Sequence, residues 1–217
     1  MVNSIHPKRN SPKSSQKPGI AYLRMSVDAG LISCFLKLLE RGFAVNIEAS
    51  LSIRELLCRQ LGISEEYVDN RIQTIFLDGR PVDNIDTAWV EDGSRLALSA
   101  AMPGLVGATF RKGGFYASLR DSISYTKTEN SILKGAGEIM LKLFNMVAKE
   151  LGPDFLAKGI RIEGSALQNF VLRNSEGLKV PTTSIHFNDE KTDVAGLLEM
   201  NWDNTAIVLR VTPQAES

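Results

Sequence analysis

The sequence has few cysteines and no excess charge of either sign. Only Cys34 and Cys58 occur among its 217 residues, too few for a disulfide framework and too isolated for a metal site. Lys and Arg together number 25, as do Asp and Glu. Because the summed charge is zero, no field of the whole molecule attracts nucleic acid or an acidic membrane. Nucleic acid is therefore not the partner we expect, and any basic contact must be local.

Long apolar runs are also missing. The longest lies around Leu31–Leu39 and is interrupted by Ser33 and Lys37, well short of the roughly 18 residues that span a bilayer. Residues 1–19 carry four basic residues and no acidic one, but they lack the apolar core of a secretion signal. We expect a flexible basic tail at 1–19, no membrane partner and a cytoplasmic location.

Groups that could perform catalysis are sparse. His6 lies in the predicted tail, and His186 lies between two apolar residues of a predicted strand. The acidic residues between Glu163 and Glu199 match neither a calcium loop nor a pair of catalytic carboxylates. Nothing supplies a nucleophile, a base and an orienting group together. We expect no enzymatic activity and no cofactor.

What the first half does contain is an ordered series of predicted elements. Ile20–Val27 is predicted as a strand, helical spacing of apolar residues runs from Leu31 to Gly42, and Phe43–Ala49 alternates as a second strand. Ser52 and Glu55 form a capping box for a helix that ends at Gly62. Two further strands, Gln73–Leu77 and Arg95–Ala100, follow and are flanked by the turns Asp78-Gly79 and Asp92-Gly93.

In this order and with these turns, Ile20–Gly107 resembles the small subunit of molybdopterin synthase and the related thiamine sulfur carrier. The shared motifs are Asp78-Gly79-Arg80-Pro81-Val82, Asp92-Gly93 and the Pro- and Gly-containing end Met102–Gly107. The resemblance implies a ubiquitin-like β-grasp domain over 20–107.

The same resemblance implies a sulfur carrier, in which a free terminal glycine is adenylated and then holds a thiocarboxylate. Here Val106 precedes Gly107, and Ala108 follows it through an ordinary peptide bond. The carrier function would therefore need cleavage after Gly107 or after Gly114, together with a protease and an adenylating partner.

Residues 108–129 are predicted to be a linker rich in glycine and aromatic residues, or a seam between two domains. Glycine N–H groups, cations and aromatic faces in this stretch can hold a phosphate or stack on a base. Packing of the aromatic side chains into the seam is the alternative that we favour. The candidate binding residues are Gly104, Gly107, Phe110, Arg111, Lys112, Gly113, Gly114 and Tyr116.

The second half, 130–217, is predicted to be a smaller α+β domain of no family that we recognise. Apolar residues from Ile132 to Leu151 recur at helical spacing, and Gly152-Pro153 is predicted to end this long helix. Ser165 and Gln168 predict a helix over Ala166–Arg173. An antiparallel sheet is predicted from Ile160–Glu163, Ser184–Asn188, Val194–Met200, which also fits a helical turn, and Thr205–Thr212.

The sequence therefore predicts an α+β protein in which a β-grasp domain precedes a smaller α+β domain with one long helix. We expect a non-catalytic binding protein with a protein partner on the β-grasp sheet or on the glycine-rich seam. One alternative is the sulfur-carrier precursor. Another is an enzyme whose site lies at the domain seam and uses Arg111, Lys112 and either Tyr116 or His186.

Overall fold

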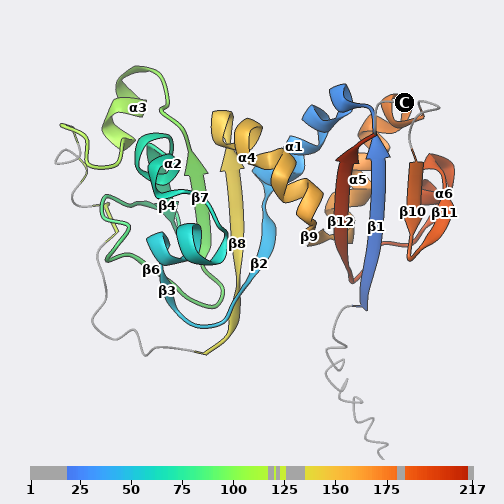
Figure 1. The fold of residues 1–217 in the computed structure, drawn as a ribbon, viewed down its shortest axis with the longest axis horizontal. Coiled ribbons are helices and arrows are strands. Elements are labelled where there is room, and N and C mark those ends of the chain that lie inside the picture. Colours follow the sequence, from blue (N-terminus) through green and yellow to red (C-terminus); the bar gives the residue numbers. More distant parts are fainter. Residues whose placement is uncertain (1–18, 117–119, 121–122, 126–134, 180–183, 215–217) are drawn as a thin grey trace, which may run out of the picture.

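The computed structural model describes residues 19–116, 120, 123–125, 135–179 and 184–214. The predicted tail, apart from Gly19, lies outside this part of the chain. The fold is α+β, as predicted, and it is built on one mixed ten-stranded sheet (Figure 1). From one edge to the other the strands are β11 (Glu190–Thr192), β10 (Ser184–Phe187), β1 (Gly19–Val27), β12 (Thr205–Pro213), β9 (Ile160–Glu163), β2 (Phe43–Ile47), β8 (Gly137–Phe144), β7 (Arg95–Ser99), β4 (Thr74–Leu77) and β5 (Arg80–Pro81).

The remaining elements are helices and one small ribbon. In chain order the helices are the 3-10 turn η1 (Ala29–Leu31), α1 (Ile32–Arg41), the π-helix η2 (Glu55–Gln60), α2 (Glu65–Asn70), α3 (Gly104–Phe110), α4 (Asn145–Lys158), α5 (Gly164–Leu178) and α6 (Val194–Glu199). β3 (Leu51–Ser52) pairs with β6 (Trp89–Val90) as a separate ribbon.

The sheet does not show the predicted succession of a β-grasp domain and a smaller domain. β1 lies between β12, to which it is parallel, and β10, to which it is antiparallel. β2 instead pairs with β8 and makes a single contact pair with β9. β1 has alternate residues buried along its length, and the nine-residue strand β12 matches it from end to end. Strands from both halves of the sequence are therefore interleaved in one sheet, which is mixed and not antiparallel.

The long helix predicted from Ile132 to Leu151 is wrong. Residues 132–134 lie outside the described chain, and 137–144 form β8 before α4 begins at Asn145. Ile139, Leu141 and Leu143 are fully buried at every second position. Over this short stretch the apolar residues fit both the helical period and the strand period. The segment forms a strand because it pairs with β2 and β7.

Gly152-Pro153 also does not end the helix, because α4 continues through Pro153 to Lys158. A Cβ on Gly152 would lie 2.5 Å from Cδ2 of Leu36 and 2.8 Å from Cδ1 of Leu39. The glycine therefore permits a close approach of α4 to α1. Of the two alternatives for Val194–Met200, the strand is wrong and the helical turn is confirmed. Its first six residues are α6, capped by Asp193, whose Oδ1 accepts from the Gly196 N–H at 2.8 Å.

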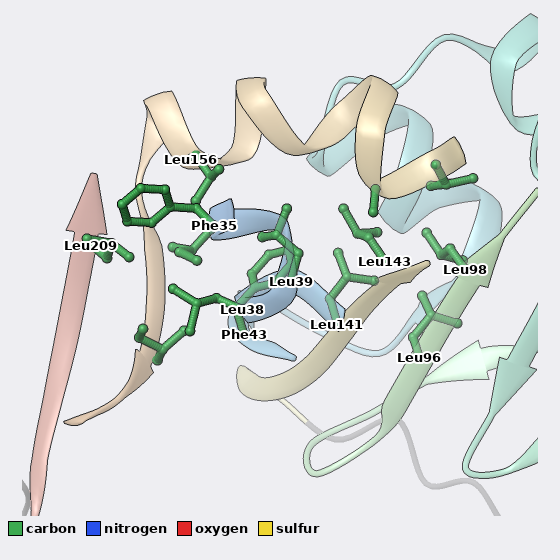
Figure 2. Packing of buried hydrophobic residues seen from close by; sticks show 14 of the residues in the cluster. Phe35, Leu38, Leu39, Phe43, Leu96, Leu98, Leu141, Leu143, Leu156 and Leu209 are labelled. Atoms are coloured by element: carbon green, nitrogen blue, oxygen red, sulfur yellow. The ribbon is translucent and has the colours of Figure 1, made fainter. Parts of the chain in front are cut away.

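The core lies on one face of the sheet, under α1, α4 and α5. The rings of Phe35 in α1 and Phe170 in α5 are 4.7 Å apart, and those of Phe43 in β2 and Phe155 in α4 are 5.2 Å apart. Figure 2 shows Leu39 of α1 among the buried side chains of this layer. One continuous core therefore joins strands from both halves of the sequence.

A polar contact joins α2 to α4 at the margin of this core. The Tyr67 hydroxyl donates to Oε2 of Glu150 at 2.7 Å, and Arg71 forms an ion pair with the same carboxylate. These two donors, Arg71 first, lower the pKa of Glu150 to about 2. Burial and the Glu150 carboxylate raise the pKa of Tyr67. Because the ionised carboxylate is the bound form, this contact depends on pH.

We expect Leu39→Ala to lower the free energy of unfolding by about 2–5 kcal/mol, because it removes a fully buried side chain at the contact of α1 with α4. Leu172→Ala, at a leucine that is 62% exposed on α5, should change it by less than about 0.5 kcal/mol. Urea unfolding curves measure both. Equal losses for the two variants would show that the core is not where the structure places it.

We expect Glu150→Gln to lower the free energy of unfolding at neutral pH. In acid the variant should differ less from the wild type, because the wild type itself loses this contribution there. The folded-state pKa of Glu150 lies below the ordinary value of 4.5, so its contribution is complete above that value and falls as pH approaches 2. The difference in unfolding free energy between wild type and Glu150→Gln should therefore shrink from pH 7 to pH 2.5. Asp154→Asn, on the same helix, is the matched control for urea unfolding at both pH values.

Candidate functional site

The face of the sheet opposite the core is accessible over several neighbouring strands. Side chains on this face alternate with the buried ones, and those that define it here are all half-buried or exposed. We call this surface the open face. It comprises Ile20, Tyr22 and Arg24 of β1, Ala206, Val208 and Arg210 of β12, Arg161 and Glu163 of β9, Ala44 and Asn46 of β2, and Glu138, Met140 and Lys142 of β8.

A groove of about 890 Å³ is lined by residues of β2, β8, β9 and β12 on the open face and by the segments next to them. Its floor includes Ala44, Met140 and Ala206, one from each of three strands. The loop 202–205 and the first residues of α5 form part of its rim. The volume lies within the range of pockets that hold ligands.

Arg161 is one of the residues that line this groove. Its position in β9 is opposite Val208 on one side and Ala44 on the other, where the two parts of the sheet meet. The guanidinium donates from Nη2 to Oδ1 of Asn46 at 2.8 Å and pairs with the Glu138 carboxylate. Within the described residues its Nε–H and Nη1 groups make no such contact. The two contacts fix a planar donor group whose other N–H groups can bind an acceptor.

The candidate residues predicted from sequence lie elsewhere, beyond β4 and β5. Gly104 begins α3, and the ring of Phe110 at its end packs 5.3 Å from that of Phe76 in β4. Gly107 is buried within α3, where a Cβ would lie 2.0 Å from the carbonyl oxygen of Met102. This glycine is required for close packing and does not lie in an extended tail.

Lys112, Gly113 and Gly114 are occupied by internal hydrogen bonds. The backbone N–H of Lys112 donates to the Gln73 carbonyl at 2.7 Å, and its Nζ donates to the Val68 carbonyl at 3.0 Å. Burial lowers the pKa of this lysine. The Gly113 N–H donates to Asp83 Oδ1 at 3.0 Å, and Gly114 donates to the Arg111 carbonyl. These groups therefore hold the segment in place.

Arg111 and Tyr116 remain exposed at the surface, and Tyr116 packs edge-on against Phe115. The residues of the seam-enzyme alternative are not all brought together. His186 is on β10, whereas Lys112 contacts Gln73, the residue before β4. Because β10 and β4 lie toward opposite edges of the sheet, His186 is far from Lys112.

The residue that sequence reasoning missed in this segment is Arg120. Its side chain is 2% exposed and makes two hydrogen bonds to the Asp83 carboxylate, at 2.9 and 2.7 Å. It also donates to the Thr109 carbonyl at 2.7 Å and to Ser124 Oγ at 2.9 Å. An arginine in a polar stretch is ordinarily exposed, so no local pattern signals this role.

No family model, curated protein or solved structure matches the chain in the three comparisons. The resemblance to sulfur carriers therefore rests on the sequence motifs. In the part of the chain that the structure describes, no helix combines the length and apolar character needed to cross a membrane. The described residues also contain no cluster of three or more His, Cys, Asp or Glu side chains arranged to hold a metal.

We expect Arg120→Ala to expose the segment around residues 104–116 to trypsin, which cleaves after Arg111 and Lys112. Loss of the contacts to Asp83 and Thr109 lowers the cost of local opening. Cleavage there should become at least about tenfold faster, which requires the free energy of local opening to fall by only about 1.4 kcal/mol. Arg59→Ala, at an exposed arginine of η2, is the control. Equal cleavage rates in the two variants would contradict an anchoring role for Arg120.

Proposed function

We propose that the protein is a non-catalytic binding protein whose macromolecular partner docks on the open face, over the groove around Arg161. The observation that carries this proposal is the groove of about 890 Å³, whose lining includes the Arg161 guanidinium held by Asn46 and Glu138. Preorganised donors bind with a smaller loss of side-chain entropy than mobile ones. The proposal moves the expected binding surface from the glycine-rich segment to the open face.

The size and composition of the open face support a macromolecule as the partner. Exposed apolar side chains continue beyond the groove, and Tyr22 and Ile20 on β1 are 57% and 55% exposed. An apolar surface rimmed by polar groups is typical of an interaction site. The protein partner expected from sequence is one class that fits this surface.

We also propose that β2, η2, β4, β5, β7 and β8 form a permuted β-grasp unit. In support, β8 is antiparallel to β2 and parallel to β7, the position that the first strand of a β-grasp occupies beside the last. In this chain the strand in that position, β8, comes after β2, β4, β5 and β7 in sequence, whereas in a β-grasp it comes first. The fold by itself assigns no function.

The carrier precursor is not the function that the geometry favours. Cleavage after Gly107 or Gly114 would separate β8 and β12 from the chain that contains β2, β7 and β1. The fragment left would expose the unpaired edges of three strands. A carrier of this kind would have to refold after processing.

We expect Ala44→Trp to abolish binding of the partner, because the indole fills the floor of the groove. Tagged full-length protein is used to capture bound protein and nucleic acid from lysate of its own cells, and both are quantified. Ala44→Trp should retain less than about a tenth of the specifically bound material. Leu172→Trp, on the exposed surface of α5, should retain all of it. Undiminished capture by Ala44→Trp would refute docking on the open face.

A further inference from the structure

Four basic or imidazole side chains form a line that begins on the open face and continues across β10 and β11 at the edge of the sheet. Strand register places Lys191 of β11 opposite His186 of β10, His186 opposite Arg24 of β1, and Arg24 opposite Arg210 of β12. Residues paired in this way project from the same face of a sheet. We call these four residues the basic row. With neighbouring strands about 4.8 Å apart, the row extends over about 14 Å.

The stability of the sheet does not explain this row. Like charges directly opposite each other on neighbouring strands are destabilising, and Arg24 and Arg210 are such a pair. Among the residues that the structure describes, Arg24 has one ion pair, 2.5 Å to the Asp189 carboxylate, in which both side chains are mostly exposed. Exposed pairs of this kind contribute little to stability. Arg210 donates to the Lys158 carbonyl at 3.3 Å, a neutral acceptor, and forms no ion pair within the described residues.

An aromatic and aliphatic surface adjoins the row. Tyr22 lies two residues before Arg24 on the same face of β1, is 57% exposed, and is opposite Val208. Val208 in turn is opposite Arg161 of the groove. Cations beside an exposed aromatic ring on a sheet are an arrangement with which proteins bind single strands, because phosphates contact the cations and bases stack on the ring.

We propose that a single-stranded nucleic acid binds across the open face, with phosphates along the basic row and a base stacked on Tyr22. This inference deepens the proposed function and rests on it. A single strand is favoured over a duplex because its bases are free to stack. The zero net charge of the chain does not oppose this contact, because charges beyond about 8–10 Å are screened at physiological salt. The field that matters is therefore that of the row itself.

The test is fluorescence anisotropy of a labelled 12-nucleotide thymidine strand with the full chain at 50 to 200 mM salt. The variant Arg24→Ser/Arg210→Ser should bind at least tenfold more weakly. The slope of log affinity against log salt should become shallower by about 1.4, since each single-strand phosphate contact contributes about 0.7. The control Arg59→Ser/Arg173→Ser removes the same charge from exposed positions on η2 and α5 and should bind within twofold of wild type.

Two further variants separate stacking from charge. Tyr22→Ala should weaken binding about tenfold, as loss of one stacked base predicts, with the salt slope unchanged. Asp189→Asn should tighten binding, because it releases Arg24 from its ion pair. Circular dichroism confirms that each variant is folded. A duplex of the same length should bind more weakly than the single strand.

Failure of the wild type to bind the strand overturns the inference, and so do equal losses in the two double variants. Binding to vesicles containing phosphatidylserine, without binding to the strand, overturns it as well. If Ala44→Trp loses a captured protein while the wild type binds no strand, the inference falls and docking on the open face stands. If Ala44→Trp loses nothing and no strand binds, both proposals fall.

Discussion

The parallel pairing of β1 with β12 is the constraint on which the rest of the structure depends. It runs along nine residues and joins the two ends of the described chain. Leu23 and Leu209, opposite each other on these strands, are both fully buried on the core face. Parallel neighbours need a long connection, and here that connection contains every other element of the described chain. Within it β2 pairs with β8, and α1, α4 and α5 cover the core face.

The same pairing determines the properties of the open face. Side chains alternate along both strands, so the register that buries Leu23 beside Leu209 also sets Arg24 beside Arg210 on the other face. A shift of one residue would expose the apolar set and bury the charges. The burial of the core therefore fixes the position of the basic row, although the core gains nothing from these charges.

Charge in this protein acts through its position and not through its sum. Ion pairs within the chain, such as Arg120 with Asp83 and Arg71 with Glu150, hold loops and helices to one another. The groups on the open face are arranged differently: Arg161 is fixed but retains donors, and Arg210 lies beside another arginine. A neutral chain can thus present a local cationic surface, which composition cannot reveal.

The sequence by itself determined the local elements, because turn residues and apolar periodicity act over a few positions. It identified β1, α1, β2, β4, β7, β9, β10 and β12, the helix over η2 and the α+β class. It could not assign 137–144, where helical and strand periods coincide, nor foresee the burial of Arg120. Only the tertiary structure decided which strands pair, and hence the groove and the basic row, because register depends on contacts between residues distant in sequence.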